Sequence, residues 1–132
     1  MKYLLAILLS LSSLQAATYY VDKAGHDTTG NGTAGLPWLT AGKAASVTVA
    51  GDTVMFGNGD FDEHVHETNS GTAGSLITYK AVNQGMAVIR GFRVGGSYTK
   101  LDGLKVSKYS GVGNTWGAAI RIEPTANNVT IT

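Results

Sequence analysis

The sequence contains no cysteine, only two prolines and few charged residues. A chain without cysteine forms no disulfides, so its core and backbone hydrogen bonds must hold it together. Ten basic residues face nine acidic ones, and charged residues make up 14% of the chain. This balance argues against nucleic acid or an anionic membrane surface as a partner. Long amphipathic helical patterns are also missing, which argues against a helical bundle.

What the chain has instead is glycine and strand-forming residues. Eighteen glycines are accompanied by many Thr, Val, Ala, Ser and Asn residues. Glycine and asparagine favour turns, whereas valine, isoleucine, threonine and tyrosine favour pleated strands. The composition predicts an all-β protein with many short strands.

The first seventeen residues, MKYLLAILLSLSSLQAA, have the layout of a secretory signal peptide. Lys2 is followed by an apolar run that ends at Leu11, and the segment closes with Ala16 and Ala17. The run is too short to favour a stable membrane span, although an uncleaved anchor is the alternative. Removal of 1–17 takes away one basic residue, so the expected secreted protein, extracellular or periplasmic, has no net charge and no membrane association.

Strand-like runs recur along the rest of the chain. The runs at 53–56, 76–79 and 101–106 have similar spacing, and shorter runs lie at 61–66, 87–90, 119–122 and 129–131. This rhythm favours a parallel β-helix, although a β-sandwich also has closely spaced short strands. We expect an N-terminal cap region at 18–51, with a short helix within 41–50, and the first coils at 52–132. The sequence stops within a strand-like run, so we expect the β-helix to be incomplete at its C-terminus.

Local motifs resemble a known group of proteins. The chain is similar to the N-terminal region of secreted right-handed parallel β-helix proteins, above all the pectate lyases of polysaccharide lyase family nine and related β-helix domains of unknown function. The motifs that carry the resemblance are Tyr19–Val21, Gly25 with Asp27, Pro37-Trp38 with Thr40, Gly51–Val54, Gly59 with Phe61 and Glu63, and Ser70–Thr72.

The resemblance implies a function as well as a fold. It implies the N-terminal part of a monomeric polysaccharide lyase that cleaves an acidic polysaccharide such as pectate by β-elimination. In these lyases the catalytic base and the calcium ligands lie on later coils. No catalytic residue is therefore assigned here; Ca²⁺ is expected in a full-length protein, and no calcium ligand is assignable in this part. We expect the part alone to be inactive. The alternative is a non-enzymatic adhesin or glycan-binding surface protein.

The most polar stretch, GDTVMFGNGDFDEHVHE at 51–67, suggests a second kind of site. If 61–67 is one strand, Asp62, His64 and His66 lie on the same face and could bind a transition metal such as Zn²⁺. The alternative is a solvated strand face, with Phe61 and Val65 in the core. A small metalloprotein is accordingly a third functional hypothesis.

Candidate contacts to sugar come from basic and aromatic residues in the second half of the chain. Lys105, Lys108 and Arg121 could meet an anionic sugar chain, and Trp116 could stack on a sugar ring. The alternative for the three cations is ordinary surface charge.

Overall fold

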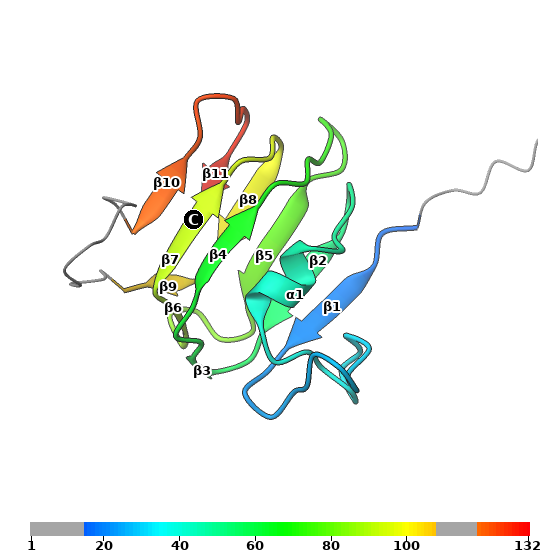
Figure 1. Cartoon of the computed structure of the whole chain (residues 1–132). Coiled ribbons are helices and arrows are strands. Elements are labelled where there is room, and N and C mark those ends of the chain that lie inside the picture. The colour runs from blue at the N-terminus through cyan, green and yellow to red at the C-terminus, as the bar shows by residue number, and fades with distance from the viewer. Residues whose placement is uncertain (1–14, 108–118) are drawn as a thin grey trace, which may run out of the picture.

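The computed structural model describes residues 15–107 and 119–132, and in these residues it has eleven strands and one short helix (Figure 1). The strands form three sheets, and every paired strand is parallel to its neighbour. The five-stranded sheet consists of β1 (Thr18–Val21), β2 (Thr53–Phe56), β5 (Ile77–Ala81), β8 (Thr99–Asp102) and β11 (Thr130–Ile131). A second sheet consists of β4 (His64–Glu67), β7 (Gly91–Val94) and β10 (Ile120–Ile122). The third consists of β3 (Gly59–Asp60), β6 (Ala87–Ile89) and β9 (Lys105–Val106).

The chain visits the three sheets in the same order on each turn. From β2 it passes to β3 and β4, and it repeats this path from β5 to β7 and from β8 to β10. Figure 1 shows β4, β7 and β10 in a front layer that runs opposite to the five-stranded sheet behind it. A β-sandwich is built from antiparallel sheets, so the parallel pairing excludes that alternative. The all-β prediction is confirmed.

The core consists of inward-facing residues that stack from turn to turn. Val54, Tyr79 and Leu101 occupy equivalent positions of the five-stranded sheet, and Val65 and Phe92 do so in the sheet of β4 and β7. All five are almost fully buried. The Tyr79 and Phe92 rings meet edge to face, with centroids 5.0 Å apart, and so join the two sheets. Burial of each such side chain stabilises the fold by about 1.5–3 kcal/mol.

The inward columns extend to the last turn, where burial decreases. Ile131 continues the column of Leu101 and Ile122 continues that of Val94. Leu101 and Val94 are buried, but Ile131 is 50% exposed and Ile122 is 47% exposed. Neither β10 nor β11 has a second paired strand among the described residues. The side chains of this turn therefore have a core neighbour on one side alone.

A single helical turn, α1 (Ala41–Ala45), covers the other end of the core. Thr40 is its N-cap, because its side chain accepts a hydrogen bond from the Lys43 N–H. Its alanines are buried, and the helix packs against β4 and β1. The expected helix within 41–50 is thus present but ends at residue 45, before the β-branched residues of 47–49. No helix in the described part of the chain has the length and apolar character needed to span a membrane.

Two predicted strands differ from the observed ones. Asp62 has a positive φ of 24°, so β4 begins at His64, and the prediction of one strand over 61–67 is wrong. Gly103, with φ of 66°, divides 101–106 into the end of β8 and β9. Strand β7 was not predicted, because Gly91 and Arg93 interrupt its apolar pattern.

Two aromatic residues and one valine named in the sequence analysis belong to the core. Trp38 is buried, its ring stacks on Tyr19 at 5.0 Å, and its Nε1 donates to the Gly30 carbonyl. Phe61 and Val65 are also in the core. The predicted signal peptide lies largely in residues 1–14, outside the described residues, and it remains a prediction, as do the cap and coil boundaries.

Candidate functional site: a basic row on the outer face of one sheet

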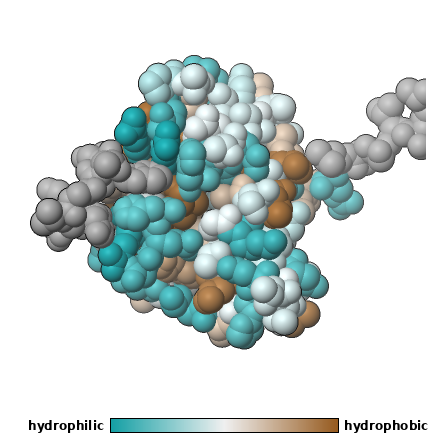
Figure 2. Space-filling view, viewed as in Figure 1, coloured by the Kyte–Doolittle hydropathy of each residue, from teal (hydrophilic) through white to brown (hydrophobic). Residues whose placement is uncertain are grey.

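The outer face of the sheet of β4, β7 and β10 carries a row of basic side chains. Along β4, Val65 and Glu67 point inward, so His64 and His66 point outward. The strand register places His66 beside Arg93 of β7, and Arg93 beside Arg121 of β10. We call His66, Arg93 and Arg121 the basic row. Figure 2 views this side of the molecule, and most of it is hydrophilic.

Glu123 sits against the basic row and partly neutralises it. Its carboxylate accepts a hydrogen bond from Arg93 Nε, and Arg121 Nε lies 3.2 Å from Glu123 Oε1. The hydrogen bond from Arg93, together with the positive charges of Arg121, Arg93 and His66, lowers the pKa of Glu123. Glu123 therefore stays ionised at neutral pH, and the two guanidinium groups retain one net positive charge.

Two glycines, Gly91 on β7 and Gly95 just beyond its end, let the histidines of β4 pack closely beside the basic row. A Cβ on Gly91 would lie 2.5 Å from His64 Nδ1, and a Cβ on Gly95 would lie 3.6 Å from His66 Nε2. The side chains of His64 and His66 thus lie over positions that carry no side chain of their own. A glycine in a strand commonly marks a place of close approach, either by a neighbour or by a ligand.

The predicted metal site gains no support from this arrangement. Asp62 forms an ion pair with Arg90, and the turn at Asp62 takes it out of the strand that carries the two histidines. Within 15–107 and 119–132, no three His, Asp or Glu side chains are grouped so that they could hold a metal ion. His64 and His66 do share the outer face, as predicted from strand alternation.

The candidate residues for sugar contact do not all lie in one place. Arg121 belongs to the basic row, whereas the exposed Lys105 lies on β9, in a different sheet. Lys108 and Trp116 fall outside the described residues. Sequence reasoning did not place His66 and Arg93 beside Arg121, because strand register is not visible in the sequence. The signal that could have helped is the alternation on each strand, which puts a basic residue at an outward position three times.

Two carboxylates, Asp52 and Glu63, fix the cap by accepting backbone hydrogen bonds. Asp52 accepts the backbone N–H groups of Ala17 and Val49, at 2.8 and 2.9 Å. Glu63 accepts those of Ala41 and Gly42 at the start of α1. Burial raises the pKa of Glu63, and these two hydrogen bonds oppose that rise.

A second buried carboxylate, Glu67, lies beneath the segment that follows α1. The Glu67 side chain is fully buried on β4 and accepts hydrogen bonds from the Asn69 N–H and from Thr48 Oγ1. Thr48 Oγ1 also lies 3.3 Å from the Tyr79 hydroxyl, and Asn69 Nδ2 donates to the Ala45 carbonyl. Burial raises the pKa of Glu67 to about 7. This network joins the end of the helix to β4 and β5.

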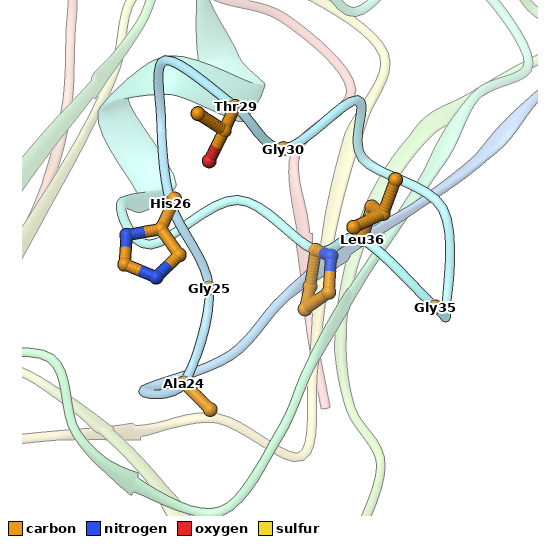
Figure 3. A pocket seen from close by; sticks show the side chains of 8 residues that line it. Ala24, Gly25, His26, Thr29, Gly30, Gly35 and Leu36 are labelled. Atoms are coloured by element: carbon orange, nitrogen blue, oxygen red, sulfur yellow. The ribbon is translucent and has the colours of Figure 1, made fainter.

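A small cavity lies in the loop of residues 24–37, away from the basic row (Figure 3). Its volume is about 80 Å³, well below the roughly 300 Å³ at which ligand pockets begin. Backbone fills much of its wall: a Cβ on Gly30 would lie 2.3 Å from the His26 carbonyl oxygen. The lining residues are Ala24, Gly25, His26, Thr29, Gly30, Gly35, Leu36 and Pro37. The cavity has room for a few water molecules but not for a sugar ring.

Comparison with known proteins finds similar folds among solved structures. No protein-family model matches the chain, and no curated protein matches its sequence. A solved rhamnogalacturonan lyase superposes with a TM-score of 0.71 at 29% identity, over 86% of this chain and 34% of that one. A GH136 lacto-N-biosidase from Eubacterium ramulus superposes with a TM-score of 0.61 at 17% identity, over 87% of this chain and 27% of that enzyme.

The coverage and identity of these two structures limit what the likeness supports. The chain spans about a third of the rhamnogalacturonan lyase. The comparison therefore supports a likeness in fold to a solved polysaccharide lyase. At 17% identity, the likeness to the lacto-N-biosidase concerns the fold alone.

Proposed function

We propose that this chain is the N-terminal part of a secreted polysaccharide lyase with a right-handed parallel β-helix fold, acting on an acidic polysaccharide such as pectate. The observation that supports the proposal most is the likeness to a rhamnogalacturonan lyase over 86% of the chain at 29% identity. The repeated path through three parallel sheets fits that architecture. The outer face of such coils offers a long, regular surface to an extended sugar chain.

The chemistry of such a lyase separates binding from proton removal. β-Elimination on a uronate requires neutralisation of the carboxylate and a base that removes the adjacent proton. The basic row supplies positive charge on the outer face, but no residue of this chain is assigned as the base. When bound elsewhere in a longer protein, Ca²⁺ would neutralise the uronate carboxylate at the reacting sugar. The role proposed for the described residues is to hold the sugar chain.

The proposal is tested by binding and by cleavage. Affinity electrophoresis of this protein through gels containing pectate, rhamnogalacturonan, alginate or chondroitin should show retardation by at least one of them. The protein extended by its downstream coding sequence should release unsaturated products, measured by their ultraviolet absorbance with and without Ca²⁺. Retardation without any unsaturated product from the extended protein would favour a glycan-binding adhesin instead. Absence of both would refute a role on polysaccharides.

A further inference from the structure

Polar groups on the outer face of the β4, β7 and β10 sheet are arranged in rows set by the strand register. One row runs from His64 to Gly91, and the next is the basic row of His66, Arg93 and Arg121. Neighbouring strands lie about 4.8 Å apart, so the basic row extends for about 10 Å across the sheet. That length suits a short stretch of an oligosaccharide better than a single sugar.

We propose that the basic row is a carboxylate-binding subsite, at which His66, Arg93 and Arg121 hold the uronate groups of a sugar chain that crosses β4, β7 and β10. This inference rests on the proposed function, and it adds the residues of a subsite and the chemical class of group that they bind. The sugar chain would cross the three strands with its carboxylates toward the guanidinium groups.

The donor capacity of Arg121 exceeds what its contact with Glu123 uses. Each guanidinium carries five N–H donors, and a carboxylate offers about four lone-pair positions. Glu123 engages Arg93 and Arg121 through their Nε atoms. Arg121 retains 45% side-chain exposure in this arrangement. A second carboxylate can therefore be bound by Arg121 without displacing Glu123, and Glu123 keeps the two guanidinium groups in place.

The fork of a guanidinium binds a planar carboxylate through two parallel hydrogen bonds, and it can bind a tetrahedral oxyanion in the same way. Both uronates and sulfated sugars could therefore meet the arginines. Uronates are the expected source because the proposed function concerns an acidic polysaccharide such as pectate. The experiment must therefore separate uronate recognition from general attraction between charges.

The test is a calorimetric titration of the protein with short oligogalacturonates, and in parallel with neutral galactan oligosaccharides and with dextran sulfate. Arg121→Gln removes the exposed guanidinium of the row. Lys80→Gln is the matched control, because it removes one positive charge from an exposed position on β5, in the neighbouring sheet. Circular dichroism of both variants checks that they fold. Because both changes are at partly or fully exposed positions, we expect both proteins to fold normally.

The expected result is binding of oligogalacturonate that Arg121→Gln weakens by about tenfold, the loss of one charged hydrogen-bonded contact. Lys80→Gln should leave the affinity within about twofold. Equal weakening by both variants, or unchanged affinity in Arg121→Gln, would overturn the inference, as would dextran sulfate binding more tightly than oligogalacturonate. Binding of the neutral oligosaccharide alone would also overturn it while leaving the proposed action on polysaccharides intact. If the extended protein cleaved a polysaccharide but this part bound no oligogalacturonate, the subsite would likewise be refuted and the proposed function would stand.

Discussion

The buried carboxylate of Glu67 makes the stability of the fold depend on pH in an unusual direction. Burial raises its pKa from an ordinary value of 4.5 to about 7. Because the folded protein holds this proton more tightly than the unfolded chain, stability from this group is fully present below pH 4.5. It is lost as the pH rises through 7. The difference between the two pKa values corresponds to about 3 kcal/mol.

Replacement of Glu67 by glutamine should remove this dependence. The glutamine side chain has nearly the same shape, and its carbonyl oxygen can still accept the hydrogen bond of the Asn69 N–H. We therefore expect Glu67→Gln to be more stable than the wild type at pH 8, by up to about 3 kcal/mol. The advantage should shrink toward zero at pH 4.5. Urea unfolding followed by circular dichroism at a series of pH values measures both quantities.

Comparison with Glu63→Gln controls for the other carboxylate near α1. Burial also raises the pKa of Glu63, but its two hydrogen bonds to the start of α1 oppose that change. The difference between wild type and Glu67→Gln isolates the contribution of Glu67 itself. If the stabilities of the wild type and Glu67→Gln changed in parallel between pH 5 and pH 8, the reasoning from burial would be refuted. Direct detection of an ionised Glu67 at pH 5 by carbon NMR would refute it too.

Two further predictions concern the cap and the turns. Gly71→Ala should destabilise the fold by about 2–3 kcal/mol, because its Cβ would lie 2.6 Å from the Tyr98 carbonyl oxygen. Gly74→Ala should be nearly neutral, because nothing lies within 4 Å of a Cβ at that position. Thermal unfolding of both variants measures the difference. Burial alone would raise the pKa of Asp27, but hydrogen bonds, chiefly from Thr40, lower it overall. Its contribution is therefore lost as the pH falls below its ordinary 3.8, and Asp27→Asn should cost about 1 kcal/mol at pH 7 and nothing in strong acid. A constant difference across the pH range would contradict this.

The parts of the fold that could be predicted from the sequence are those set by local pattern. The apolar run at 53–56 predicted a strand, which is β2, and the spacing of similar runs predicted parallel strands in repeated turns. The ends of strands were less predictable, because Asp62 and Gly103 change the backbone direction within runs that look continuous. Asp62 adopts a positive φ and pairs with Arg90 of the next turn, and a single sequence shows neither the backbone angle nor the pairing.

The candidate site depended on information that a single sequence does not carry. Arg121 was identified as a basic residue on a strand, but its neighbours were not. Arg93 and His66 join it because β4, β7 and β10 pair in one particular register. A shift of one residue would have turned them to different faces. The polar contact of Glu67 with Thr48 was hidden in the same way, since Thr48 lies 19 residues away in the chain and follows α1, which packs on β4.

The parallel pairing of the strands also has a consequence for how this chain folds. Among the described strands no pair is antiparallel, so folding of this part cannot begin from a strand hairpin. Each ladder forms only after a long stretch of chain has closed, as when Val54 meets Tyr79. The entropy cost of closing the loop comes before the stabilising contacts form, so folding is slow in such topologies. Until the second turn arrives, the first has unpaired edges, and the speed of closure then decides between folding and association with other chains.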